Sequence, residues 1–202
     1  MKLFSPILLA VSIVATLPAG ELNPAERKAL LNHLNQSSTE FADSLKGLTN
    51  AQWNYKPAPE VWSIAECAEH IALSEDLLRE MVGSKVLASA PNAQPSAERK
   101  ALDEKVLKMI TDRSFKAKAP EPLQPSRQFA TPAAALERFQ ESRKKTVALA
   151  SDRKDLRDHA APHPMLKELD AYQWLLYLSG HTMRHTAQIR EVQASSGYPA
   201  GQ

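Results

Sequence analysis

The sequence has one cysteine and six glycines among its 202 residues, and it has no apolar run of the roughly 20 residues that a membrane-spanning helix needs. The single thiol, Cys67, excludes an internal disulfide, so the fold must depend on packing or on a bound metal. Few glycines and no sustained period-two alternation predict a chain that is nearly all helical. Internal repeats, a phosphate-binding loop and a dinucleotide-binding fingerprint are also missing.

A strong charge of either sign is missing as well. The 25 basic and 23 acidic residues give a net charge of +2. No basic run with interleaved aromatic residues is present, so nucleic-acid binding has no electrostatic support. We therefore expect no nucleic-acid partner.

Residues 1–20 have the composition of a secretory signal peptide. Lys2 supplies a positive start, residues 3–17 are largely apolar, and the small residues at 18–20 offer a cleavage region. An uncleaved N-terminal anchor is the alternative. Cleavage would leave no stable membrane anchor, so the sequence predicts an exported protein, periplasmic or secreted.

Residues 21–202 are predicted to form a single helical domain, because this length can bury one sizeable core. Helical spacing of apolar residues, together with capping residues, predicts four long helices. A shorter helix at about 97–110 and a proline-rich connector at 111–132 separate the second long helix from the third. Loops are expected at 53–62, which carries three large aromatic residues, and at 159–164. The four long helices are expected at about 24–47, 64–82, 132–152 and 171–195.

His181 and His185 are four residues apart in the last helix. This spacing places both imidazoles on one helical face, where they can share a divalent ion. His70, at the edge of the apolar face of the second helix, could supply a third nitrogen if the two helices are neighbours. Three protein ligands with an open position are typical of catalytic metal sites, whereas structural zinc sites are closed by four. The alternative is that the histidines are packed, hydrogen-bonded core residues.

Other residues have weaker claims to a site. His163 could approach a metal as a mobile fourth ligand, whereas His33 and His159 lie in less favourable contexts. Glu66 and Glu69 are the carboxylates nearest in sequence to His70 and are candidate general bases, although Glu66 also fits a capping box with Ser63.

Several neighbouring residues have both a functional and a packing interpretation. Arg184 could meet an anionic substrate or lie in solvent, and Cys67 is expected to be a small buried hydrophobe. Trp53 and Trp62 are expected to pack rather than stack on a substrate. Partners that could orient the imidazoles are Ser74, Gln188 and Tyr177.

Two motifs resemble the DinB-like family: WNYKPAPEVWSIAECAEH (residues 53–70) and GHTMRHTAQI (residues 180–189). The resemblance covers about residues 21–198. It implies an all-α, up-down-down-up four-helix bundle of the DinB/YfiT-like type. It also implies a divalent metal, often zinc or nickel, held by His70, His181 and His185.

The same resemblance implies several activities. Some members are described as thiol-dependent S-transferases and others as metal-dependent hydrolases, and homodimers are compatible with the family. The predicted export argues against a cytosolic thiol as cosubstrate. The expectation is thus a metal-dependent hydrolase or thiol S-transferase acting on a small molecule of unknown identity, with no catalytic residue assigned. A non-catalytic metal- or ligand-binding bundle is the alternative.

Overall fold

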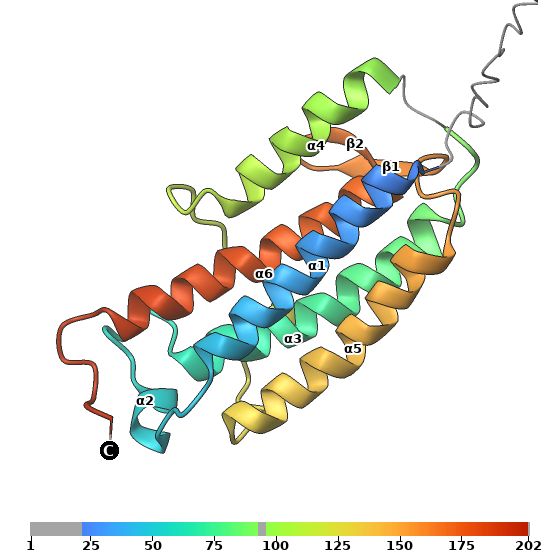
Figure 1. The fold of residues 1–202 in the computed structure, drawn as a ribbon. Coiled ribbons are helices and arrows are strands. Elements are labelled where there is room, and N and C mark those ends of the chain that lie inside the picture. The colour runs from blue at the N-terminus through green and yellow to red at the C-terminus, as the bar shows by residue number, and fades with distance from the viewer. Residues whose placement is uncertain (1–21, 93–95, 202) are drawn as a thin grey trace, which may run out of the picture.

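A computed structural model describes residues 22–92 and 96–201. The predicted signal peptide at 1–20 lies outside the described residues. Four long helices form a bundle (Figure 1), as predicted: α1 (Pro24–Ser44), α3 (Ile64–Met81), α5 (Pro132–Asp152) and α6 (Ala171–Gln193). The smaller elements are α2 (Asn50–Asn54), the π-helical turn η1 (Val82–Val86), α4 (Ser96–Thr111), the 3₁₀ turn η2 (Glu121–Leu123), β1 (Ala160–His163) and β2 (Lys167–Asp170).

The four bundle helices follow the expected up-down-down-up order. In Figure 1, α3 and α5 run in one direction and α1 and α6 in the other. Because α3 and α5 are parallel, the chain between them must return along the length of the bundle. This return contains α4 and the segment from 112 to 131, which we call the connector.

Local capping signals set where the helices begin. The side chain of Asn23 accepts from the backbone N–H of Glu26, and the Glu26 carboxylate accepts from the backbone N–H of Asn23. The same reciprocal arrangement pairs Ser63 with Glu66 at α3 and Asp170 with Gln173 at α6. These boxes satisfy backbone N–H groups that have no partner within the helix, and they confirm the predicted starts.

Two of the predicted loops contain regular structure instead. The segment 159–164 was predicted as a loop, but residues 160–163 pair with 167–170 in an antiparallel hairpin, with Ala160 opposite Asp170 and His163 opposite Lys167. The four-residue strands are too short to produce a readable alternation. Trp53 was placed in a proline-rich loop, yet it lies in the one-turn helix α2 with 1% of its surface exposed. Its burial confirms that this segment packs against the bundle.

The fifth helix, α4, lies on α6 outside the four-helix bundle (Figure 1). Gly180 permits this contact, because a Cβ atom there would lie 2.3 Å from the Cγ2 atom of Ile110. The connector then passes α3 at η2 before α5 begins. Since Gly180 directly precedes His181, α4 contacts α6 next to the histidine pair.

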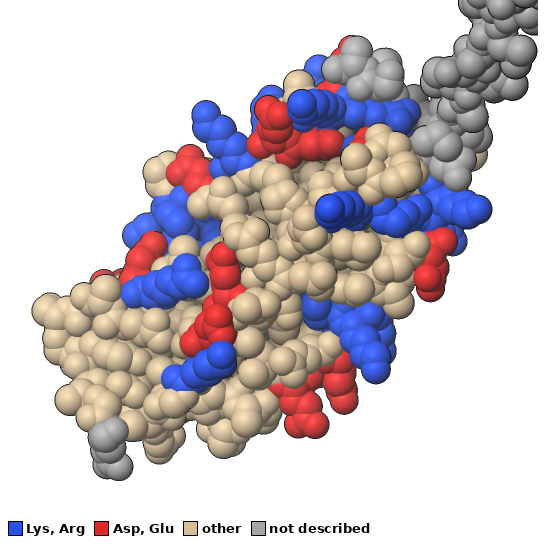
Figure 2. Space-filling model, viewed as in Figure 1, with Lys and Arg blue, Asp and Glu red and all other residues tan. Residues whose placement is uncertain are grey.

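The core has two apolar clusters with a polar level between them. One cluster contains Leu30, Leu34 and Leu175, and the other contains Phe41, Phe139 and Ile189. On each bundle helix the residues between these clusters include buried polar side chains: Ser37, Glu75, Arg143 and Thr182. At the surface, acidic and basic side chains are interspersed over the face in Figure 2, and few of either lie near α2 and the C-terminal end. No helix in the described ranges is long and apolar enough to cross a membrane.

Candidate metal centre

The structure brings together the three histidines singled out from the sequence. His70 projects from α3, and His181 and His185 project from successive turns of α6. One ring nitrogen from each lies within 4.8 Å of the other two, and the Nε2 atoms of His70 and His181 are 3.2 Å apart. His70 and His185 are buried, with 3% and 9% of their surfaces exposed, whereas His181 keeps some exposed surface.

The outer nitrogens of the two buried rings are held by oxygen acceptors. His70 Nδ1 lies 2.8 Å from the backbone oxygen of Leu123, and His185 Nδ1 lies 2.9 Å from Oε1 of Gln188. A carbonyl oxygen can only accept a hydrogen bond, so each Nδ1 carries the proton. The Nε2 atoms of both rings consequently keep their lone pairs, which is the tautomer that a metal ligand needs.

The environment keeps the three imidazoles neutral. Burial lowers the pKa of His70, lowers the pKa of His185 to about 3, and lowers the pKa of His181 well below its ordinary value. His181 has the neighbouring imidazoles and Arg184 as further causes, and for His185 the further causes that lower its pKa are His70, Arg184 and Arg113. A metal ion competes with protons for the same lone pairs. The lowered pKa values therefore favour a metal at neutral pH.

The donor set fits a divalent transition metal. Two nitrogens bound to a tetrahedral zinc at about 2.0–2.1 Å would be about 3.3 Å from each other, close to the 3.2 Å between His70 and His181. Imidazole nitrogens suit zinc and nickel, whereas magnesium and calcium prefer oxygen. Three such ligands leave at least one coordination position open.

Two aromatic rings border the histidines. The Trp62 ring centroid lies 5.0 Å from His70 and 6.1 Å from His185. Tyr177, one turn before His181 on α6, stacks on the His181 ring at 6.3 Å with an interplanar angle of 27°. Both rings are partly exposed. The expectation that Trp62 serves packing alone thus omitted its place at the edge of the cluster.

The remaining histidines lie elsewhere. His163, the predicted alternative fourth ligand, packs against Trp174 and Tyr177 at 5.0 and 5.1 Å between centroids, and its Nδ1 accepts from the Met165 N–H. His159 contacts the backbone oxygen of Ser89. The group of possible metal ligands found in the described parts of the chain contains neither of them, nor His33.

The two glutamates considered as general bases have other partners. Glu66 completes the capping box with the Ser63 N–H at 2.7 Å and pairs with Lys56. Glu69 is 2% exposed and accepts hydrogen bonds from the connector, including the Ser126 N–H at 2.7 Å. Both carboxylates are therefore bound by protein donors in this arrangement, and neither is assigned as a base.

Other predicted roles change in the structure. Arg184 has neither of its expected roles. Its guanidinium donates to the backbone oxygens of Ile110 in α4 and of Asp112 and Phe115 in the connector. Gln188 does hold the His185 ring through Nδ1, whereas the hydroxyl of Ser74 is buried with no hydrogen-bond partner among the described residues. Cys67 is fully buried, and burial raises the pKa of its thiol, as expected of a packed residue.

One partner of the cluster had no sequence signal. The Leu123 backbone oxygen that holds His70 lies 53 positions away in the connector. Any residue has such an oxygen, so no residue type could have marked it. The proline-rich composition indicated an extended segment but not where it crosses the bundle.

Comparisons with known proteins agree with this architecture. Residues 33–189 match the family model of the DinB superfamily. The chain is 30% identical over 160 residues to the uncharacterized protein YuaE of Bacillus subtilis (strain 168), which covers 79% of this chain and 94% of that protein. A solved structure of YfiT from Bacillus subtilis, described as a probable metal-dependent hydrolase with an unusual four-helix bundle topology, aligns with a TM-score of 0.52. That alignment covers 90% of this chain and 93% of the other at 16% identity, so it shows a shared fold.

Proposed function

The chain belongs to the DinB superfamily, and from this premise we propose that it is an exported metal-dependent hydrolase of small-molecule substrates. His70, His181 and His185 would hold one divalent ion, zinc or nickel. The observation that carries the proposal is the convergence of three imidazoles within 4.8 Å, two of them held with Nε2 free for a metal. The description of YfiT as a probable metal-dependent hydrolase supports the same class of reaction.

The residues of the chain bind and orient, and the ion supplies the reactivity. A divalent ion held by three imidazoles lowers the pKa of water and polarises a substrate carbonyl or phosphoryl oxygen. Leu123 and Gln188 fix the two buried rings from behind, so the lone pairs stay aimed at one point. A substrate would approach beside His181, the one residue of the three that is not fully buried.

Trp62 and Tyr177 would form the substrate contacts. Their rings border the cluster at opposite members, His70 and His185 on one side and His181 on the other. Both present apolar ring surface to whatever approaches the histidines, which favours a substrate with an apolar or planar group beside the scissile bond. The Tyr177 hydroxyl has no hydrogen-bond partner among the described residues and can donate to a substrate oxygen.

Hydrolysis is preferred to thiol transfer because the predicted export would separate the protein from cytosolic thiols. The passive alternative is a bundle that binds a metal without turnover. Purified protein without a histidine tag is expected to contain about one equivalent of metal by elemental analysis. Ester, amide and phosphoester substrates, together with thiol-transfer substrates, can then be screened with the metal present, after chelation, and after metal is restored.

His185→Ala and His163→Ala form a matched pair for this test. We expect His185→Ala to abolish both stoichiometric metal and hydrolysis, and His163→Ala to retain both, because His163 lies outside the cluster. Metal binding without turnover of any substrate would favour the passive alternative. Turnover of thiol-transfer substrates alone would reassign the reaction, and absence of metal would overturn the proposal.

Export can be tested separately. The intact mass of protein recovered outside the inner membrane should correspond to processing near residues 18–20. Full-length protein confined to the cytosol would remove the export part of the proposal and would restore cytosolic thiols as candidate cosubstrates.

A further inference from the structure

Both buried ligands are linked through their outer nitrogens to the connector. His70 Nδ1 donates directly to the Leu123 backbone oxygen in η2. The Gln188 Oε1 atom that holds His185 also accepts from Arg113, at 3.5 Å, at the start of the connector. The connector is thus part of the second layer of contacts around the histidines rather than a distant loop.

Glu69 fastens this segment to α3. Its Oε1 atom accepts from the N–H and the hydroxyl of Ser126, at 2.7 and 3.0 Å. Its Oε2 atom accepts from the N–H groups of Arg127 and Gln128, at 2.9 and 3.2 Å. Arg127 has a φ of 65°, a left-handed conformation that is uncommon for a residue other than glycine. Three successive N–H groups therefore converge on one carboxylate that is 2% exposed.

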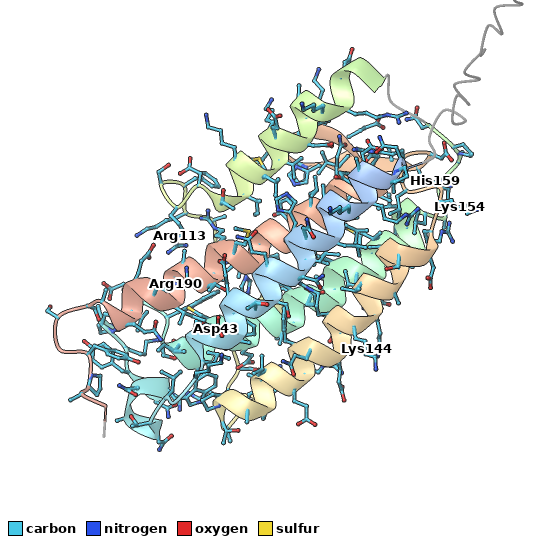
Figure 3. All side chains as sticks on the ribbon, in the orientation of Figure 1. Asp43, Arg113, Lys144, Lys154, His159 and Arg190 are labelled. Atoms are coloured by element: carbon cyan, nitrogen blue, oxygen red, sulfur yellow. The ribbon has the colours of Figure 1, made fainter. Side chains whose placement is uncertain are left out.

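The other end of the segment is fastened to α6. Arg113 pairs with Glu191, with its Nη2 atom 2.7 Å from Oε2, and it lies beside α6 in Figure 3. Arg184, next to His185, donates to the backbone oxygens of Asp112 and Phe115. Residues adjacent in sequence to two of the histidines, Glu69 and Arg184, thus hold the connector across the cluster.

We propose that Glu69 is a positioning residue of the metal centre. It holds residues 126–128 on α3, which keeps the Leu123 oxygen against His70 Nδ1 and so fixes the tautomer and the orientation of that ligand. The proposal rests on the metal site proposed above. The position of the Leu123 backbone oxygen depends on the position of the connector. A side chain near His70 must therefore hold the connector in place.

A reciprocal effect follows from thermodynamic linkage. If the connector stabilises the metal-competent His70, a bound metal must stabilise the docked connector by the same factor. If Glu69 served stability alone, its substitution would lower the overall stability of the fold without a specific effect on metal affinity or on docking of the connector. Metal affinity and the local exposure of the connector therefore separate the two roles.

The test compares Glu69→Gln with Glu66→Gln in the full chain. Both substitutions replace a carboxylate by an amide on the same helix, and glutamine still serves the capping box at position 66. We expect Glu69→Gln to weaken zinc binding by about 10–100-fold, the usual effect of removing an outer-layer partner, and Glu66→Gln to leave it unchanged. Chelator competition gives the affinity, and the absorption spectrum of the cobalt(II)-loaded protein reports the ligand geometry.

Limited trypsin digestion supplies the second readout. Arg127 is exposed in the connector, and its backbone N–H is bound by Glu69, so cleavage after Arg127 requires residues 126–128 to leave Glu69. We expect zinc to slow this cleavage in the unaltered protein and to protect Glu69→Gln much less. Leu30→Ala, a core truncation in α1, serves as the stability control and should accelerate cleavage throughout the chain rather than at the connector.

The outcomes are separable. Zinc binding by the unaltered protein with equal affinities for Glu69→Gln and Glu66→Gln would overturn the positioning role while leaving the metal site intact. If Leu30→Ala weakened zinc binding as much as Glu69→Gln does, the effect of Glu69 would be one of overall stability. That result would also overturn the positioning role. No zinc binding by the unaltered protein would overturn the proposed function itself.

Discussion

Two buried polar clusters occupy the middle of the same bundle, and they differ in how many of their bonding positions are used. All five N–H donors of Arg143 have partners: Glu75 accepts two, and Leu34, Ser37 and Thr182 accept one each. The three histidines instead direct nitrogens at one another, with 3.2 Å between two Nε2 atoms.

The difference distinguishes a structural cluster from a candidate binding site. The Arg143 cluster is complete, because both of its charges are paired and its donors are saturated, so a ligand has nothing to gain there. In the histidine cluster, protein oxygens hold the outer nitrogens of His70 and His185, while the inner nitrogens face only one another. Buried polar groups are thus candidates for a functional site when their remaining bonding positions face one another instead of a protein partner.

Removing one charge from the complete cluster should have the largest effect. Glu75→Ala leaves the Arg143 guanidinium buried without its counter-charge, and we expect a loss of about 3–5 kcal/mol of unfolding free energy. Urea denaturation measures this loss. The zinc affinity of the protein that remains folded should stay close to that of the unaltered chain, because the Glu75 carboxylate bonds to Arg143 and Thr146 and not to the histidines.

The matched control replaces both charges. Glu75→Leu combined with Arg143→Met should recover most of the stability, since an apolar pair can replace a buried ion pair at little cost. If the double variant were as unstable as Glu75→Ala, the hydrogen bonds to α1 and α6 would be the stabilising element rather than the pairing of charge. A similar loss of zinc affinity in Glu75→Ala and in the double variant would show that the Arg143 and histidine clusters are energetically coupled.

The parts of the molecule set by local signals were predictable. Capping pairs such as Ser63 and Glu66 act over three residues, and the four-residue spacing of His181 and His185 fixes their common face whatever the rest of the chain does. The helical spacing in the second helix made His70 a candidate third nitrogen, and the resemblance to the DinB-like family implied that its helix lies beside the last one. Helix starts and the grouping of the histidines therefore followed from the sequence.

The parts set by tertiary contact were not predictable. From the sequence, Glu69 is a candidate general base and Arg184 either contacts an anionic substrate or lies in solvent, because only their position beside the histidines is visible. Their partners are backbone N–H and C=O groups of the connector, which every residue has. The short hairpin at 160–170 was missed for a related reason, because its pairing depends on a backbone ladder rather than on a side-chain pattern.

Acidification should act on the histidine cluster in metal-free protein. Burial lowers the folded-state pKa of His185 to about 3, below the roughly 6.5 of an unfolded histidine. The unfolded chain therefore takes up protons first, so the stability present above pH 6.5 is lost as the pH falls toward 3. His185 alone should remove about 1 kcal/mol between about pH 6.5 and 5.5.

Denaturant midpoints of chelator-treated protein across this range measure the effect. His185→Gln is the control, because the difference between the two pH profiles isolates one imidazole from the other titrating groups. A difference that does not change with pH would mean that His185 is accessible to protons in the folded state.

The smallest effect is expected at Cys67, which has a metal-ligating side chain but belongs to neither cluster. It is fully buried one turn before His70, packs in the apolar cluster with Ile64 and Ile71, and has a thiol pKa raised by burial. Cys67→Ala should cost about 1 kcal/mol or less through lost packing and should leave zinc affinity unchanged. The native thiol should resist a disulfide reagent until denaturant is added. Weaker zinc binding by the alanine variant would place the Cys67 thiol within reach of the metal centre. Rapid labelling of the native protein would show that the thiol is accessible. Either result would mean that the position of a residue on α3 does not by itself separate His70 from Cys67 as a metal ligand.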